Sequence, residues 1–206
     1  MTVSTGSQRH RGRPFDDEAT TRILTETLLM LAEGGYAHLS VQAVAQRAGV
    51  TRPTVHRRWA TKEELAIASI AWAQEGVGDV VPTGDLEADL IALLDRMHWT
   101  MTAANGLVIV ASFVAEAPST PGLLDAFHRH VIAPRRAAIA AAFERAHPEW
   151  EAATVNLFSD LVSGAYYARA IAGIPFPPEW AQKVIRCVLD GHLTADHDLD
   201  VVGLAS

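Results

Sequence analysis

The 206-residue chain contains one cysteine, Cys187, and lacks any apolar run of the roughly 18 residues that a membrane span requires. A lone cysteine excludes an intramolecular disulfide and a cysteine-rich metal site, so we interpret Cys187 as a small buried apolar residue. The polar N-terminus lacks the apolar segment of a secretory signal. These absences predict a cytoplasmic protein with no membrane partner.

Aromatic residues are few (7%), no stretch alternates apolar and polar residues as a strand does, and alanine is abundant. This composition favours helices, and we expect an all-α fold of about nine helices. The chain lacks a phosphate-binding Walker loop, a nucleophile elbow and an HExxH motif. His128 and His130 are two positions apart, so they leave a helix on different faces and form a poor metal pair. We therefore expect no enzymatic activity, cofactor or bound metal.

Negative charge dominates the chain, but it is unevenly distributed. The net charge is -7, yet residues 1–65 hold nine Lys and Arg against seven Asp and Glu, and the remainder holds eight against seventeen. Nearly all basic residues are arginines, since only Lys62 and Lys183 are lysines. A basic head on an acidic body fits a protein that touches nucleic acid with one end only.

Residues 39–65 (LSVQAVAQRAGVTRPTVHRRWATKEEL) form the most informative segment, because they are basic and contain no acidic residue before Glu63. Ser40 is a favourable N-cap for one short helix, and Gly49 supplies a tight turn after it. Thr51 is the expected cap of the next helix. A capping box that begins at Thr61 starts a further helix. The pattern predicts two short helices joined by a turn.

The second of these helices has two distinct faces. Val55 and Trp59 are four positions apart and apolar, so they pack inward and turn Arg52, Pro53, His56 and Arg57 outward. A helix fits the major groove of DNA, where base edges can be read. Arg52 is the best candidate for a bidentate contact to guanine, and Thr54 for a base edge or a thymine methyl group. His56, Arg57 and Lys62 are expected beside phosphates.

Residues from about Pro14 to Ile67 resemble the DNA-binding domain of the TetR family of transcriptional regulators. The matching residues are Gly35-Tyr36, Leu39-Ser40-Val41, Val44-Ala45, Ala48-Gly49-Val50, Thr54-Val55, Arg57 and Thr61-Lys62-Glu63-Glu64-Leu65. His56 stands where the family usually has tyrosine, and a histidine can still donate to a phosphate. The resemblance implies a double-stranded DNA operator as partner and the DNA-binding residues Ser40, Gln42, Arg52, Pro53, Thr54, His56, Arg57, Arg58 and Lys62.

The same resemblance implies a division of the chain. Residues 1–13 would be a flexible basic arm, in which Arg11 and Arg13 lie where some members reach the minor groove. Residues 14–62 would form a three-helix helix-turn-helix domain, and residues 63–206 a helical ligand-binding and dimerisation domain. In the latter we expect a helix over about 122–146, kinked at Pro134.

The last two long helices pair across a two-fold axis in this family. Here they would span about 149–172 and 178–193, and each has apolar residues on more than one side. The resemblance thus implies a homodimer that places two recognition helices about one DNA turn (~34–36 Å) apart, or somewhat more, on a pseudo-palindrome.

The resemblance also implies a small-molecule effector, largely apolar, which we expect to bind between the middle helices. The candidate lining residues are large and adaptable: Met97, Trp99, Met101, Phe113, Phe127, Phe158, Tyr166 and Tyr167. His98 is a candidate to orient a polar group of the effector, but exposure is the favoured interpretation. The expected function is a ligand-responsive dimeric regulator, most simply a repressor. Two alternatives stay open: a DNA-binding regulator without a ligand, acting as activator or docking module, and an all-helical enzyme.

Overall fold

The computed structural model describes residues 14–190, with side chains from Glu18 onward, and every element in this range is helical. The elements are α1 (Pro14–His38), α2 (Val41–Arg47), α3 (Arg52–His56), α4 (Lys62–Gly76), α5 (Leu86–Ala103), α6 (Gly106–Glu116), α7 (Leu123–Phe127), the π-helical turn η1 (His128–Ile132), α8 (Ala133–Ala146), α9 (Ala152–Ile171) and α10 (Trp180–Asp190). Because α7, η1 and α8 run on as one rod, the described range holds nine helices, and the expected all-α class is confirmed.

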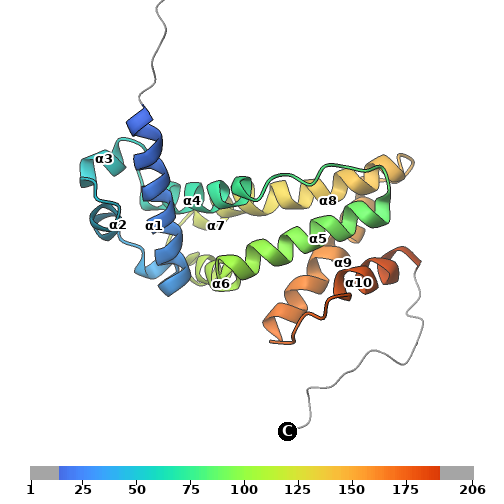
Figure 1. Cartoon of the computed structure of the whole chain (residues 1–206). Coiled ribbons are helices and arrows are strands. Elements are labelled where there is room, and N and C mark those ends of the chain that lie inside the picture. Colours follow the sequence, from blue (N-terminus) through green and yellow to red (C-terminus); the bar gives the residue numbers. More distant parts are fainter. Residues whose placement is uncertain (1–13, 191–206) are drawn as a thin grey trace, which may run out of the picture.

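Two ends of the molecule are distinct in Figure 1. Helices α1, α2 and α3 form a head, and α4 leads from it into a body along which α5 and α8 run. Helices α9 and α10 lie together at the far side of the body. The expected basic arm (residues 1–13) and the expected end of the last helix at residue 193 lie outside the described residues.

The capping residues of the head behave largely as their sequence predicts. The hydroxyl of Ser40 accepts from the backbone N–H of Ala43, and Gly49 has the positive φ of 66° that the turn requires. The hydroxyl of Thr61 accepts from the N–H of Glu64. Thr51 is the exception: it occupies the N-cap position of α3, but its hydroxyl bonds the hydroxyl of Thr54 instead of a backbone N–H.

Apolar side chains of the head and of the body share one core. This cluster includes Ile23, Leu31, Tyr36, Val44, Val55, Leu65, Ile70, Ile109, Phe113, Leu123 and Phe127. A second cluster fills the rest of the body with Leu90, Leu94, Met97, Phe143, Val162, Tyr166 and Ile185 among its buried members. The first cluster crosses the position near residue 62 at which the sequence suggests a domain boundary.

A π-helical turn, and not a simple kink, accommodates Pro134. The N–H of Ala133 bonds the carbonyl of His128, an i→i+5 contact, immediately before the proline that has no N–H to give. The wider turn lets Phe127, Val131 and Arg135, spaced by four residues, line the same hollow. Turns of this kind occur frequently at functional sites.

By length and composition, no single helix in residues 14–190 is suited to crossing a membrane. Within the same residues, α5 and α6 together are long and apolar enough, but their axes are bent by 78°.

The junction of α1 with α6 depends on Gly35. This residue has φ 70° and ψ -173°, a backbone conformation that is nearly restricted to glycine. A Cβ atom at Gly35 would lie 2.6 Å from Cβ of Ser112, whose hydroxyl accepts from the N–H of Tyr36 at 3.0 Å. A side chain at this position would therefore both strain the backbone and push α6 away.

We predict that Gly35→Ala lowers the free energy of unfolding by at least about 2 kcal/mol, because backbone strain alone costs about 1–3 kcal/mol there. Gly76→Ala is the matched control, since its added Cβ meets nothing within 4 Å at the end of α4. The control should be neutral or stabilising by up to about 1 kcal/mol. Urea denaturation measures both, and equal effects of the two substitutions would contradict the strain.

Candidate nucleic-acid interface and ligand cavity

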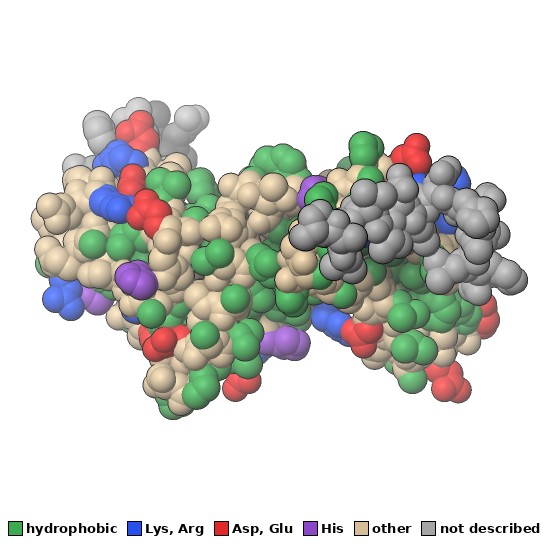
Figure 2. All heavy atoms as spheres, turned by 90° about the horizontal axis from the view of Figure 1, so that it is seen from below, with side chains coloured by type: hydrophobic (Ala, Val, Ile, Leu, Met, Phe, Trp, Pro, Cys, Tyr) green, Lys and Arg blue, Asp and Glu red, His purple; other side chains and the backbone are tan. Residues whose placement is uncertain are grey.

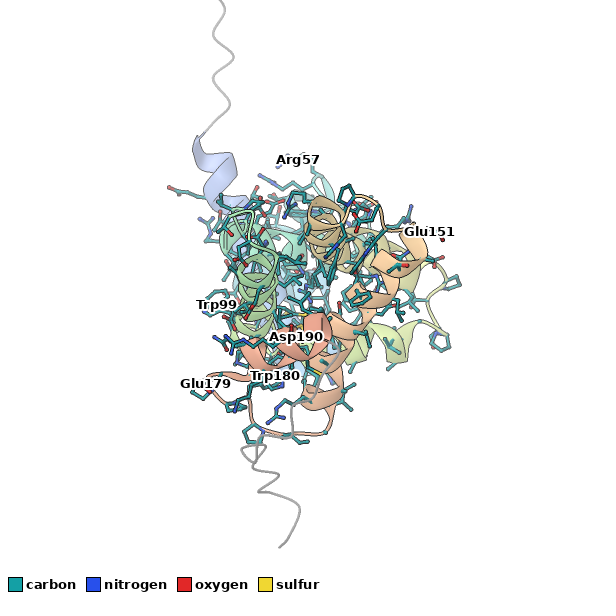
Figure 3. All side chains as sticks on the ribbon, turned by 90° about the vertical axis from the view of Figure 1, so that its right-hand side faces the viewer. Arg57, Trp99, Glu151, Glu179, Trp180 and Asp190 are labelled. Atoms are coloured by element: carbon teal, nitrogen blue, oxygen red, sulfur yellow. The ribbon has the colours of Figure 1, made fainter. Side chains whose placement is uncertain are left out.

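Helix α3 presents one polar face to solvent and one apolar face to the core. Val55 is fully buried and Trp59 packs against the same core. The side chains of Arg52, Pro53, His56 and Arg57 are exposed, and Arg57 projects from the molecule in Figure 3. In Figure 2, Lys, Arg and His side chains are visible at the head end, with Asp and Glu side chains beside some of them. This is the outward face that the sequence predicts.

The side chains on this face are held by short-range contacts. Nε of Arg52 donates to Nε2 of His56 at 3.2 Å, one turn further along the helix. The hydroxyls of Thr51 and Thr54 lie 2.9 Å apart. Ser40 and Gln42 are exposed at the start of α2, where the hydroxyl of Ser40 is engaged as the cap. The face thus presents donors that are ordered along a helix before any partner binds.

Two of the predicted DNA-binding residues are used within the fold. Arg58 donates from Nε to the hydroxyl of Thr20 and from Nη1 to the carbonyl of Thr54, so it ties α3 to α1. Nζ of Lys62 lies 4.3 Å from the centre of the Tyr36 ring, a cation–π contact. Burial lowers the pKa of Lys62, although the carboxylates of Glu116 and Glu63 oppose this. Both residues therefore differ from the freely exposed Arg57.

Another arginine of the head, Arg47, forms a bidentate pair with Glu33. Its two Nη atoms lie 3.2 and 2.9 Å from the two carboxylate oxygens, so α2 is tied to α1 and the charge is balanced. Sequence alone shows Arg47 as part of a basic segment, because the acidic partner comes from a different helix. The positive charge left to solvent is concentrated on α3.

A cavity of about 170 Å³ lies where the body meets the head. Three of the predicted ligand residues line it: Trp99, Met101 and Phe127. Trp99 is 57% exposed and stands at the outer surface in Figure 3. The lining residues that the sequence analysis missed are Leu28, Ile70, Ala73, Gln74, Thr100, Ala103, Ala104, Gly106, Ile109, Val110, Val131 and Arg135.

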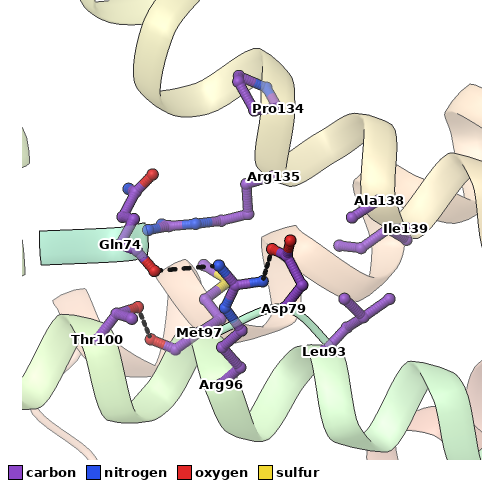
Figure 4. Close-up of a pocket in the computed structure, with 10 residues that line it drawn as sticks. All are labelled: Gln74, Asp79, Leu93, Arg96, Met97, Thr100, Pro134, Arg135, Ala138 and Ile139. Atoms are coloured by element: carbon purple, nitrogen blue, oxygen red, sulfur yellow. Dashed lines mark hydrogen bonds and ion pairs between the residues drawn. The ribbon is translucent and has the colours of Figure 1, made fainter. Parts of the chain in front are cut away.

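A second cavity of about 140 Å³ adjoins the first and contains Met97, another predicted residue (Figure 4). Gln74, Thr100 and Arg135 line both cavities. Most of the missed residues are small or aliphatic, and no local sequence signal distinguishes them from ordinary core.

The other predicted ligand residues are not among those that line the two cavities. Phe113 is fully buried between the rings of Tyr36 and Phe127. Phe158 packs against Phe143 and Trp150 in the second core. Among the described residues, the rings of Phe113 and Phe158 therefore fill the protein core and do not line either cavity.

Tyr166 and Tyr167 are adjacent on α9 but differ in surroundings. Tyr166 is buried against Phe176 and Trp180, whereas the hydroxyl of Tyr167 lies 3.4 Å from Nη1 of Arg135. The interpretation of His98 as exposed is wrong: its ring packs on Phe176 at 4.6 Å between centres, and its Nδ1 is buried.

A continuous set of contacts joins the larger cavity to the head. Phe127 in the cavity wall stacks on Phe113 at 4.5 Å, and Phe113 packs on Tyr36 at 5.1 Å between ring centres. The hydroxyl of Tyr36 donates to Oε1 of Glu63 at 2.7 Å, at the start of α4. Two aromatic rings, those of Phe113 and Tyr36, therefore connect Phe127 in the cavity wall to the start of α4, the helix that follows α3.

Comparison with protein families agrees with this architecture. A model described as "Bacterial regulatory proteins, tetR family" matches residues 23–68, and one described as "Tetracyclin repressor-like, C-terminal domain" matches residues 80–188. Together they cover most of the head and most of the body.

Individual relatives lead to the same family. The chain is 31% identical over 176 residues to an uncharacterized HTH-type transcriptional regulator of Mycobacterium tuberculosis, which covers 82% of this chain and 83% of the relative. It is 26% identical over 171 residues to the DNA-binding transcriptional repressor TetR of Mycobacteroides abscessus (81% and 90% coverage).

Solved structures share the fold. A crystal structure of a TetR family transcription regulator aligns with TM-score 0.67 at 27% identity and covers 85% of this chain and 98% of that one. The flavonoid-responsive regulator FrrA aligns with TM-score 0.66 at 20% identity (85% and 95% coverage), which shows the fold alone. The chain belongs to the TetR family of transcriptional regulators, which are DNA-binding proteins and not enzymes.

Proposed function

We propose that the protein is a homodimeric, effector-responsive repressor that binds a pseudo-palindromic operator and is released when a small molecule enters the body. The observation that carries this proposal is the pairing of an exposed basic face on α3 with a cavity whose wall shares one core with the head. Binding to chromosomal DNA would place its action in the cytoplasm.

The proposed DNA contact is made by the exposed face of α3 in the major groove. Arg52 at the leading end reads a guanine, and Thr54 contacts a neighbouring base. Arg57 and His56 contact phosphates, and the N–H groups at the start of α2 bind another phosphate near Ser40. Arg58 and Lys62 contribute mainly by fixing α3 and α4 against α1, since their side chains are engaged there.

The proposed dimer contact lies on α9. This helix buries Val155, Ser159, Val162 and Tyr166 against its own body. On the opposite face, an exposed apolar stripe repeats at helical spacing: Leu157 (57% exposed), Leu161 (49%), Gly164, Ala168 and Ile171 (72%). A stripe of this kind has the form of a helix–helix interface, and Gly164 at its centre allows close approach.

Helix α10 would support this contact from the side. Its apolar face, with Ala181 and Ile185 buried, packs on α5 and α9, and Arg186 bonds Glu87 of α5 at 2.9 Å. The sequence predicts that both helices pair, but it does not show which apolar residues face the protein's own core, as Val155 and Val162 do. The stripe on α9 is the better candidate because it remains exposed.

Release from DNA would follow from the contacts between cavity and head. A ligand that displaces Phe127 would disturb Phe113 and Tyr36, and with them the position of α4 relative to α1. The effector needs only to bind the DNA-incompetent arrangement more tightly, by about 1–3 kcal/mol, to weaken DNA binding roughly 5- to 150-fold. The flavonoid response named for FrrA indicates that this fold can carry an effector response.

The operator contact is tested by Arg52→Ala. We expect a loss of about 1–3 kcal/mol that is confined to one base position in each half-site, because a base contact discriminates where a phosphate contact does not. Fluorescence anisotropy on single-base operator variants measures it. Arg129→Ala, an exposed arginine of η1 outside the head, should leave binding unchanged. A uniform loss over all sequences would show that Arg52 contacts phosphate.

The dimer contact is tested by Leu161→Glu. The new carboxylate would be buried against its symmetry mate in the other protomer. Each protomer then loses about 1.5 kcal/mol or more of contact free energy, so the dissociation constant of the dimer should increase by at least about a hundredfold. Leu124→Glu on α7, also an exposed leucine, should leave the dimer intact. Sedimentation velocity distinguishes the two. A Leu161→Glu protein that remains dimeric at micromolar concentration would refute the proposed interface.

The head–body contact predicts a pH effect for Tyr36→Phe. Burial raises the pKa of Glu63, but hydrogen bonds, the first from Tyr36, and the charge of Lys62 bring it below the ordinary value of 4.5. A lowered carboxyl pKa stabilises the fold above the unfolded pKa, and this contribution is lost as the pH falls through the folded value.

Removing the hydroxyl should therefore cost about 1 kcal/mol of unfolding free energy at pH 7, and the cost should shrink below about pH 4.5. Thermal unfolding between pH 3 and pH 8 measures the effect. Tyr167→Phe is the control, because its hydroxyl faces Arg135 and not a carboxylate. A pH-independent cost for Tyr36→Phe would contradict the coupling to Glu63.

A further inference from the structure

Arg135 occupies an unusual position in the body. It follows the π-helical turn and Pro134 at the start of α8, and it lines both cavities. In Figure 4 its side chain crosses the smaller cavity and points toward Gln74 of α4. Because the two cavities meet at Gln74, Thr100 and Arg135, the guanidinium stands between the larger cavity and the smaller one, which is also lined by Arg96 and Asp79.

The charge of Arg135 is not balanced by a nearby carboxylate among the described residues. Its recorded contacts are weak: Nη1 lies 3.7 Å from the sulfur of Met101 and 3.4 Å from the hydroxyl of Tyr167. The side chain is half-buried, so it has lost part of its hydration. A guanidinium carries five N–H donors in a planar fork, and few of them are used here.

Arg96 in the same lining provides a contrast. Its Nη1 lies 3.3 Å from the carboxylate of Asp79, and its Nη2 donates to the carbonyl of Gln74 at 3.3 Å. Among the described residues, Asp79 is the only acidic one that lines either cavity. Arg96 and Asp79 offset each other, so the lining retains one positive charge, that of Arg135.

The rest of the larger cavity is apolar. Around Arg135 it presents Leu28, Ile70, Met101, Ile109, Phe127 and Val131, together with the ring of Trp99 at its rim. Such a surface binds a hydrocarbon or aromatic body and offers few hydrogen bonds to it. A ligand complementary to the whole site combines an apolar body with one anionic group.

We propose that Arg135 is the anion-recognition residue of the effector site, and that the effector is an amphipathic monoanion whose carboxylate pairs with the guanidinium of Arg135. The fork of an arginine matches the two oxygens of a carboxylate. A cationic ligand would be repelled, and a neutral one would leave the half-buried charge uncompensated. This inference rests on the proposed effector response, but it concerns the chemistry of the ligand.

The test is isothermal titration calorimetry of the full-length protein, without DNA, using matched probes. Octanoate and 2-naphthoate are compared with octanamide and 2-naphthamide, which have nearly the same shape and no charge. Wild-type protein should bind at least one carboxylate about tenfold or more tightly than its amide, because a charge-assisted bond is formed only with the acid. Arg135→Gln should remove this preference.

Arg96→Gln is the matched control, since it lines the adjoining cavity but already has a partner. It should keep the preference for the carboxylate. Arg135→Lys, which keeps the charge and loses the fork, should retain part of it. Circular dichroism confirms that each variant is folded.

The proposal is overturned if no carboxylate binds more tightly than its amide, including the case in which none binds, or if Arg96→Gln and not Arg135→Gln removes the preference. A carboxylate that binds through Arg135 but leaves operator affinity unchanged would support the anion site and count against the effector response. An amide that releases DNA more effectively than the acid would support the effector response and count against the anion site.

Discussion

The architecture depends on the contact between Gly35-Tyr36 of α1 and Ser112-Phe113 of α6. The glycine backbone lets α6 approach α1 closely, and the N–H of Tyr36 then bonds the hydroxyl of Ser112. Phe113 fills the space between Tyr36 and Phe127. Because of this junction, head and body share a core, so a change in the body can reach the head through packed side chains. A flexible linker between two separate cores would transmit far less.

The arginine-rich head divides its charges between structure and surface. Arg47 is paired with Glu33, Arg58 is bonded to α1 and to its own helix, and Lys62 rests on the ring of Tyr36. These contacts fix α2, α3 and α4 against α1. Arg52 and Arg57 are left on the exposed face of α3. A rigidly held helix with a few exposed donors suits sequence reading, since little side-chain and backbone order remains to be gained on binding.

Local sequence signals predicted most of the helix boundaries of the head and the inward face of α3. The cap at Ser40, the turn at Gly49 and the inward pair Val55 and Trp59 are set by neighbours within a few residues, so they could be predicted. The cavity could not, because its lining comes from α1, α4, α5, α6 and the rod from α7 to α8. Aromatic residues at helical spacing do not reveal whether they line a hollow or fill a core: Phe127 does the first and Phe158 the second. The engagement of Arg58 was hidden for the same reason, since Thr20 is distant in sequence.

The central claim, a dimer that reads DNA with α3, is tested most directly by selecting duplexes from a random pool with the purified protein and measuring their affinity across salt concentrations. The account predicts an enriched pseudo-palindrome with half-sites about one helical turn apart or somewhat more, and an affinity that falls steeply with salt as phosphate counterions are released. Recovery of unenriched sequences, together with an affinity that does not change with salt, would contradict it.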